Sequence, residues 1–133
     1  MSPVTVQWLR DDLRDVVNQI VPDTQAGYGG TAKDAFAPWR GDEEFGHNVA
    51  LVGGKTGTGE VIKDRNNQPF REVDNAWFIG VAPINNPKYV VSIVVERGGS
   101  GGKVAAPIAV QILQYLLNGP DGVLDLAEGT DSD

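Results

Sequence analysis

Cysteine is absent from this 133-residue sequence, and histidine occurs once. Without cysteine, the chain has no disulfide and no thiolate to act as a nucleophile or a metal ligand. The single histidine, His47, is interpreted as a solvated loop residue rather than a general base. Because a transition-metal site needs a cluster of such ligands, we expect no metal site and no cofactor.

Basic residues are also scarce, and long apolar runs are missing. Lys and Arg total 11 against 18 Asp and Glu, which gives a formal net charge of −7. A surface of this sign repels a phosphate backbone and argues against a nucleic-acid partner. The apolar stretches are shorter than the roughly 20 residues that a membrane span needs. Residues 1–5 show no basic segment leading into an apolar one, so we expect no membrane segment and no targeting signal in this chain.

The pattern of the first 20 residues predicts an amphipathic helix over about residues 6–20. Five apolar residues recur at helical spacing: Leu9, Leu13, Val16, Val17 and Ile20. Thr5 is the expected N-cap, and Pro22 cannot continue the helical ladder. The long glycine-rich loop that follows is expected to be either functional or packed against the rest of the fold.

Three strands are predicted next. Residues 48–52 are apolar and lead into a glycine-rich strand end at residues 53–59. Residues 76–82 and 89–96 read as two further strands, joined by a short proline- and asparagine-containing turn that makes them an antiparallel hairpin. Both are apolar at consecutive positions, which predicts that helices cover both faces of the sheet.

A second packing helix is expected from the end of a glycine run at residues 98–102 to about Leu117. Its apolar stripe has five members: Ala105, Ile108, Ala109, Ile112 and Leu116. Gly119 stands at the C-cap position and Pro120 follows it. We therefore expect one domain over residues 1–120 and an acidic flexible tail over residues 121–133.

These elements predict an α/β fold of the α+β type, a three-stranded antiparallel meander flanked by an N-terminal and a C-terminal helix. Two helices are too few to cover both faces of three strands. The sequence therefore predicts an incomplete layer structure, with apolar surface and one sheet edge left open.

The segment Lys55-Thr56-Gly57-Thr58 carries the most chemical information. It places an ammonium group, two hydroxyls and a glycine at one strand end, an array that suits recognition of an anionic group. The missing side chain of Gly57 allows a ligand backbone to lie against the strand. An exposed edge here suits an extended peptide that pairs as an added strand.

The segment has other interpretations. A phosphate-binding loop ending in Gly-Lys-Thr needs glycine at position 49, which is Val49. A dinucleotide fingerprint needs glycine at position 62, which is Ile62. A glycine-rich hairpin corner with an incidental lysine stays open as the structural alternative.

The chain resembles the C-terminal part of the transpeptidase domain of class B penicillin-binding proteins. Lys-Thr-Gly is a signature of the penicillin-binding protein and serine β-lactamase superfamily. Four blocks carry the resemblance in the family's order: Gly30-Thr31-Ala32, GGKTGTGE, NAWFIGVAP and YVVSIVVERGGSGGKVAAPIA. Each block alone is a weak pattern, but four in sequence are specific.

The resemblance implies a piece of the β-lactamase/transpeptidase-like fold, from a peptidoglycan D,D-transpeptidase of cell division or elongation. Lys55 would help to organise the protons around the nucleophile, and the Thr56 and Thr58 hydroxyls would hold the carboxylate of a stem peptide or a β-lactam. The N–H of Thr58 would be an oxyanion-hole donor. Localisation at the periplasmic face of the inner membrane is implied by the same analogy.

The sequence departs from the family pattern before Lys55. Residues 1–54 contain neither Ser-x-x-Lys nor Ser-x-Asn, and Ser2 is their only serine. Ser100 and Lys103 fit Ser-x-x-Lys literally, but they follow the third strand and resemble the family's turn into the last helix. We therefore expect no nucleophile and no activity in this chain alone. The alternative is a non-catalytic interaction module, or a piece of a split protein, that pairs its open sheet edge with a partner chain.

The remaining features are expected to have structural roles. Three tryptophans are expected to be core or loop-anchoring aromatics rather than a ligand platform: Trp8, Trp39 and Trp77. Three acidic residues are expected to form a solvated run rather than a metal cage: Asp42, Glu43 and Glu44. Residues 60–74 are expected to form an exposed hairpin or lid.

Overall fold

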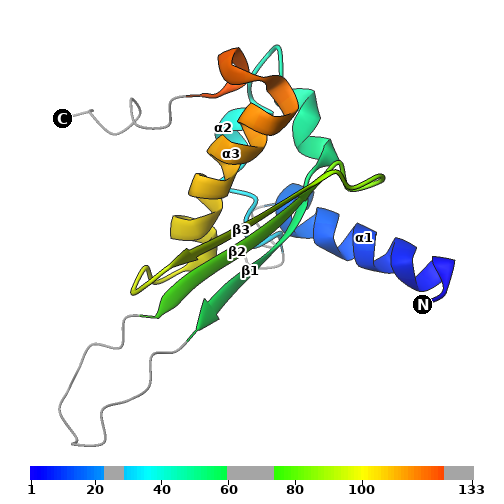
Figure 1. Ribbon diagram of the computed structural model, residues 1–133, viewed down its shortest axis with the longest axis horizontal. Coiled ribbons are helices and arrows are strands. Elements are labelled where there is room, and N and C mark those ends of the chain that lie inside the picture. The colour runs from blue at the N-terminus through cyan, green and yellow to red at the C-terminus, as the bar shows by residue number, and fades with distance from the viewer. Residues whose placement is uncertain (23–28, 60–73, 125–133) are drawn as a thin grey trace, which may run out of the picture.

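The structure is a computed structural model that describes residues 1–22, 29–59 and 74–124. Its three strands form one antiparallel sheet in the order β1-β2-β3, so the predicted α+β meander with flanking helices is confirmed. Figure 1 shows α3 lying across one face of the sheet and α1 at one end of it. The elements are α1 (Pro3–Asn18), α2 (Ala37–Arg40), η2 (Gly46–Leu51), β1 (Gly53–Gly59), β2 (Asn75–Ala82), β3 (Tyr89–Val95), η3 (Gly101–Ala105), α3 (Ala106–Asn118) and η4 (Pro120–Gly122).

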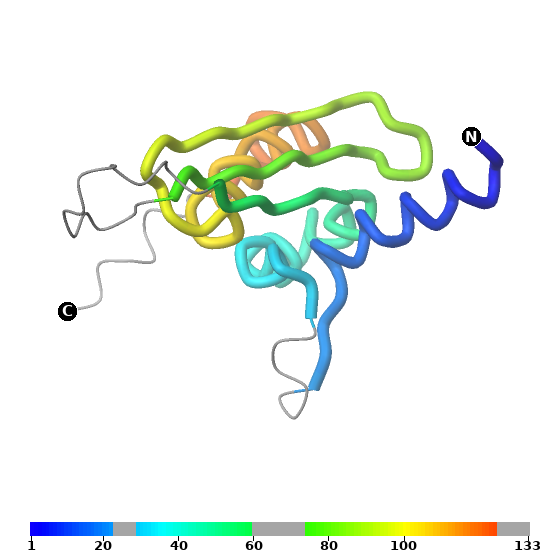
Figure 2. The backbone as a smooth tube through the Cα atoms, turned by 90° about the horizontal axis from the view of Figure 1, so that it is seen from below, coloured from blue at the N-terminus to red at the C-terminus, as the bar shows by residue number. Residues whose placement is uncertain are grey.

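Helix α1 begins three residues earlier than the sequence predicted. Its N-cap is Ser2, whose Oγ accepts a hydrogen bond from the N–H of Thr5 at 3.2 Å, and Pro3 occupies the first helical position. The prediction of Thr5 as the cap was therefore wrong, because a proline at the first position and a serine before it make the stronger start signal. Figure 2 shows α1 running from its free N-terminus up to the edge strand β1.

The C-terminus of α1 is closed by the segment that follows it. Gly30 and Ala32 donate backbone hydrogen bonds to the carbonyls of Gln19 and Val16. Arg40 donates from Nη2 to the carbonyl of Val17 at 2.8 Å. Burial lowers the pKa of Arg40, but a guanidinium stays charged at neutral pH. These bonds provide partners for carbonyls at the C-terminus of the helix, which ends at Asn18 rather than near Ile20.

The described part of the glycine-rich loop, from residue 29 onward, is packed against the rest of the fold, which was one of the two predicted options. Phe36 and Trp39 are fully buried and stack with ring centroids 6.1 Å apart. Phe36 also lies 6.0 Å from Phe78 of β2. Residues 48–52 were predicted to be strand, but 46–51 form the 3₁₀-helix η2, and the strand starts at Gly53. Burial of Val49 and Val52 explains the apolar run.

The β2–β3 hairpin agrees with its predicted bounds to within one residue. Side chains alternate between faces: Ala76, Phe78 and Ala82 are fully buried, whereas Trp77 and Ile79 are 43% and 46% exposed. The prediction that both faces are covered was wrong for the described part of the chain. There, α3 packs on one face and the other stays open, as the count of helices had indicated.

The predicted stripe of α3 is confirmed in part: Ala105 and Ala109 are fully buried and Leu116 packs against the core, but Ile108 and Ile112 were wrongly included. Ala109, Val110 and Leu113 are fully buried, but Ile108 and Ile112 are 42% and 39% exposed. Residues 101–105, where the helix was predicted to begin, form a π-helical turn that leads into α3. The C-terminal prediction is confirmed. Gly119 has φ +80° and donates to the carbonyl of Tyr115 at 2.9 Å, and Pro120 follows it.

The chain remains packed for several residues past α3. Gly122 is buried, and the N–H of Leu124 donates to Oε1 of Gln114 at 3.3 Å. The predicted domain of residues 1–120 and tail of residues 121–133 stay predictions, because 125–133 lie outside the described residues. The predicted hairpin or lid at residues 60–74 lies outside them as well, except for Asp74. Among the described helices, none is long and apolar enough to cross a membrane.

Candidate functional site

Strand β1 carries all four predicted site residues. Among the described strands its neighbour is β2, so β1 lies at an edge of the sheet. Lys55 pairs with Ile79 and Gly57 pairs with Trp77, which places them on the open face. Thr56 and Thr58 pair with Phe78 and Ala76, on the face that α3 covers. Because neighbours on a strand alternate, the lysine and the two hydroxyls belong to opposite faces that meet at one exposed edge.

Lys55 is exposed at this edge, and its Nζ donates to the carbonyl oxygen of Thr56 at 2.7 Å. The exposed rings and methyl groups of Trp77 and Ile79 lie beside it on the open face. This pairing places a positive charge at the border of an apolar surface. Such a surface suits a ligand that has both an anionic and an apolar part.

The hydroxyls of Thr56 and Thr31 meet across the edge. Their Oγ1 atoms lie 2.7 Å apart, and either atom can be the donor. Thr58 is exposed, so its hydroxyl faces solvent at the same edge. The sequence indicated Thr31 only as part of a family block. Its contact with Thr56 places it at the site, and no local sequence pattern reveals a contact between residues 25 positions apart.

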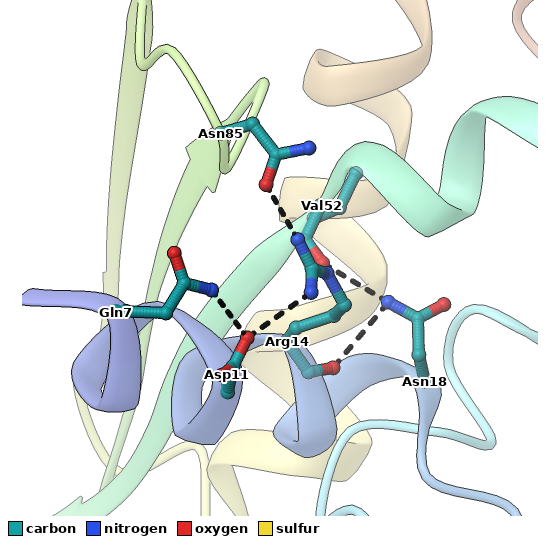
Figure 3. Close-up of polar contacts among 6 residues, drawn as sticks. All are labelled: Gln7, Asp11, Arg14, Asn18, Val52 and Asn85. Carbon is teal, nitrogen blue, oxygen red and sulfur yellow. Dashed lines mark hydrogen bonds and ion pairs between the residues drawn. The ribbon is translucent and has the colours of Figure 1, made fainter. Parts of the chain in front are cut away.

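Side-chain hydrogen bonds fix the start of β1. Asn18 donates from Nδ2 to the carbonyl oxygen of Val52 at 3.0 Å (Figure 3) and to that of Val49 at 3.2 Å. These bonds tie the end of α1 to the residues before the strand. The N–H of Ile84 donates to the carbonyl of Leu51 at 2.7 Å. Sequence reasoning missed Asn18, because an asparagine near a helix end has no pattern that names its distant partners.

A second polar contact joins α1 to the β2–β3 turn. Arg14 donates from Nη2 to Oδ1 of Asn85 at 2.7 Å and from Nη1 to Oδ1 of Asp11 at 3.3 Å. Gln7 donates to the same oxygen of Asp11 at 2.9 Å. Figure 3 shows these side chains on one side of α1, pointing toward the strands. Hydrogen bonds from α1 therefore reach both the residues that precede β1 and the turn that follows β2.

Ser100 lies where the chain turns into η3. Its carbonyl oxygen accepts the N–H groups of Lys103 at 3.2 Å and Val104 at 2.9 Å. Lys55 donates to the carbonyl oxygen of Thr56, and no hydrogen bond between Ser100 and Lys55 is found in the described residues.

The other predicted residues have mixed outcomes. Trp39 is buried, as predicted, and its Nε1 donates to the carbonyl of Phe45 at 3.1 Å. The core role predicted for Trp8 and Trp77 was wrong, since Trp8 is 66% exposed and Trp77 faces the open side. His47 is exposed on η2. In residues 1–22, 29–59 and 74–124, no group of three or more His, Asp or Glu side chains is arranged to hold a metal ion.

Asp42 has a structural role within the acidic run. Its Oδ1 accepts hydrogen bonds from the N–H groups of Glu44 at 3.0 Å and Phe45 at 2.7 Å. Glu43 and Glu44 are exposed, as the sequence predicted. The run therefore closes a turn before η2.

Sequence comparison identifies the family to which this α+β chain belongs. Residues 1–114 match the family described as the penicillin binding protein transpeptidase domain. The chain belongs to this family, and the resemblance to class B penicillin-binding proteins is confirmed.

Individual relatives agree with this assignment. The peptidoglycan D,D-transpeptidase MrdA of Haemophilus influenzae is 35% identical over 96 residues, which are 67% of this chain and 13% of that protein. The penicillin-binding protein PbpB of Mycolicibacterium smegmatis is 31% identical over 88% of this chain and 17% of that protein. This chain therefore spans less than a fifth of the length of these relatives.

A solved structure shows the same partial fold. The crystal structure of Pseudomonas aeruginosa PBP2 in complex with WCK 5153 aligns with 96% of this chain and 22% of that one. The TM-score is 0.57 at 32% sequence identity. The three-stranded sheet and its helices therefore form part of a transpeptidase fold.

Proposed function

We propose that this chain is the substrate-binding segment of a peptidoglycan D,D-transpeptidase, and that it takes the stem peptide or a β-lactam at strand β1. The observation that carries the proposal is the strand edge at residues 55–58, where Lys55 and Thr58 are exposed and Thr56 and Gly57 are half-buried. An ammonium group, two hydroxyls and an apolar surface border it. These are the groups that an anionic peptide end requires.

Each residue has a proposed role. Lys55 supplies the positive charge that attracts a carboxylate and organises protons near the nucleophile of a complete domain. Thr56 and Thr58 donate hydroxyl hydrogen bonds to the carboxylate, and Gly57 leaves room for the ligand backbone. The N–H of Thr58 is proposed as one oxyanion-hole donor. In enzymes such a donor contributes about 3 to 4 kcal/mol when the attacking group is present.

Non-covalent ligand binding tests the proposal. Benzylpenicillin is titrated into the chain, and the NMR amide signals of β1 are followed. Thr58→Val removes one hydroxyl and keeps the side-chain shape, so we expect binding about tenfold weaker. Asn86→Ala, in the distant β2–β3 turn, is the control. Signals of β1 that do not respond to the ligand contradict the proposal.

The chain by itself is proposed to have no acyl-transfer activity, because residues 1–54 lack Ser-x-x-Lys and Ser-x-Asn. Incubation with a fluorescent penicillin is expected to leave it without covalent label. A labelled band of this chain would refute the proposal, and loss of that label in Ser100→Ala would identify Ser100 as the nucleophile.

By analogy with its relatives in cell-wall synthesis, the segment is proposed to work outside the cytoplasmic membrane.

A second candidate is an interaction module that associates through the open side of the sheet. It is favoured by four apolar side chains that are exposed there: Trp77, Ile79, Val90 and Val94. Apolar patches of this kind usually mark interaction surfaces. Size-exclusion chromatography tests it, since a monodisperse monomer at high concentration speaks against a surface that associates with a partner chain.

A further inference from the structure

The turn into α3 lies directly against the backbone of β1. Gly101 is buried, and a β-carbon built on it would overlap the carbonyl oxygens of both Gly57 and Trp77. The same β-carbon would lie 3.0 Å from the amide nitrogen of Gly57. Gly57 and Trp77 are paired residues of β1 and β2. Gly101 therefore contacts the edge strand at the residue between Thr56 and Thr58.

Gly102 makes a second close approach at the same edge. A β-carbon on this residue would overlap the carbonyl oxygen of Thr31 and lie 3.7 Å from Cγ2 of Thr56. Thr31 and Thr56 are the two residues whose hydroxyls meet at 2.7 Å. The two glycines thus contact both segments that contribute hydroxyls to the edge.

Gly101 meets backbone atoms of Gly57 and Trp77, and Gly102 meets a backbone atom of Thr31. Backbone atoms cannot rotate away as a flexible side chain can. A side chain on Gly101 would push either the helical turn or strand β1 out of place. The turn has a second anchor, because η3 continues into α3, which is buried against the sheet through Ala106, Ala109 and Val110. Displacement therefore falls partly on β1, an edge strand with one strand neighbour in the described residues.

We propose that Gly101 and Gly102 are positioning residues for the candidate site. Their missing side chains set how closely the first turn of the last helix supports β1, and so set the place of the Thr56 hydroxyl and the Thr58 N–H. This inference rests on the proposed function of β1. It gives the glycine run before α3 a role beyond that of a turn.

A matched pair of variants tests the inference. Gly101→Ala adds the methyl group that meets β1. Gly99→Ala lies two residues away in the same turn, where φ is +81° and no atom lies within 4 Å of the added carbon. The control is destabilised by backbone strain but has no contact with β1. Both variants are compared with the wild-type chain in two measurements, the NMR amide shifts of Gly57 and Thr58 and the affinity for benzylpenicillin.

For Gly101→Ala, we expect the amide shifts of Gly57 and Thr58 to change. The affinity for benzylpenicillin should fall about tenfold, because a displaced β1 loses about one charge-assisted hydrogen bond to the ligand. Gly99→Ala is expected to lower the unfolding midpoint while leaving both measurements unchanged. Unchanged β1 shifts in Gly101→Ala, or equal changes in the two variants, overturn the inference. If the wild-type chain does not bind benzylpenicillin, the proposed function fails, and the amide shifts still decide the positioning role.

Native-state hydrogen exchange of the wild-type chain covers the case in which Gly101→Ala does not fold. If the turn supports β1, the amides of β1 and those of residues 103–105 open together, with the same dependence on denaturant. Exchange of the β1 amides that is independent of the helical turn overturns the inference.

Discussion

At the scale of single residues, the candidate site depends on contacts between side chains that are far apart in sequence. Thr56 has its hydroxyl held by Thr31, and Asn18 binds the two carbonyls that precede β1. None of these residues is charged. Their contribution is geometric, because a hydrogen bond between two ordered groups fixes the distance between the segments that carry them.

Removal of the Thr31 hydroxyl is predicted to release Thr56. Thr31→Val keeps the side-chain shape and leaves Oγ1 of Thr56 without its partner, so the Thr56 side chain is expected to sample more than one rotamer. The free energy of unfolding is expected to fall by less than about 1 kcal/mol, because both groups can bind water instead. Three-bond NMR couplings of Thr56 measure the rotamers, and Thr31→Ser, which retains the hydroxyl, is expected to preserve them.

Removal of the Asn18 amide is predicted to have a larger effect on stability. Asn18→Ala leaves the carbonyls of Val49 and Val52 without their side-chain donor in a partly buried place, which should lower the free energy of unfolding by about 1 to 3 kcal/mol. Urea unfolding followed by circular dichroism measures this change. Asn86→Ala, in the exposed β2–β3 turn, should change stability by no more than about 0.5 kcal/mol. Equal effects of the two variants would contradict the role of Asn18.

At the scale of elements, the decisive feature is the relation between α3 and the sheet. Leu113 and Val110 face the buried side of the sheet, whereas Ile108 and Ile112 do not. Gly80 of β2 allows this approach, since a β-carbon there would lie 3.0 Å from Cδ1 of Leu113. The helix can therefore lie close to the middle strand.

Truncation of two neighbouring side chains on α3 checks this orientation. Leu113→Ala opens a cavity under the sheet and should lower the free energy of unfolding by about 2 to 5 kcal/mol. Ile112→Ala removes a side chain that is already 39% exposed and should have a clearly smaller effect. Urea unfolding of both variants gives the comparison. A larger loss for Ile112→Ala would show that Ile112, as the sequence predicted, and not Leu113 is buried.

At the scale of the whole molecule, the sheet has one covered and one open face. Trp77, Ile79 and Val94 expose apolar surface on the side where Lys55 also lies. An exposed apolar sheet face favours association. The chain spans only a small share of the length of its relatives.

Polar substitution on the open face is predicted to reduce self-association without loss of stability. Val90→Thr combined with Val94→Thr keeps β-branched side chains and replaces methyl groups with hydroxyls at positions that are 69% and 49% exposed. The free energy of unfolding should change by no more than about 1 kcal/mol for the pair. Light scattering over a range of concentrations measures association. Association that persists unchanged would show that this face is not its cause.

The sequence alone determined the features that depend on neighbouring residues. Helical spacing, the proline- and asparagine-containing turn and the Gly119-Pro120 stop predicted the helices, the hairpin and the C-cap, and the ordered blocks around Lys55 predicted the family. The roles of residues 55–58 stay predictions. At residues 48–52 the local pattern predicted the wrong element, and along α3 it was right for Ala105 and Ala109 but wrong for Ile108 and Ile112.

Only the tertiary structure decided which distant residues meet. The contacts of Thr31 with Thr56, of Asn18 with the start of β1 and of Gly101 with Gly57 join segments between 25 and 44 positions apart. The exposure of Trp77 was also decided there. The physical reason is that the spacing of apolar residues along the chain encodes the type of element and the face of that element that tends to be buried. Which surfaces then lie together depends on how all the elements pack at once.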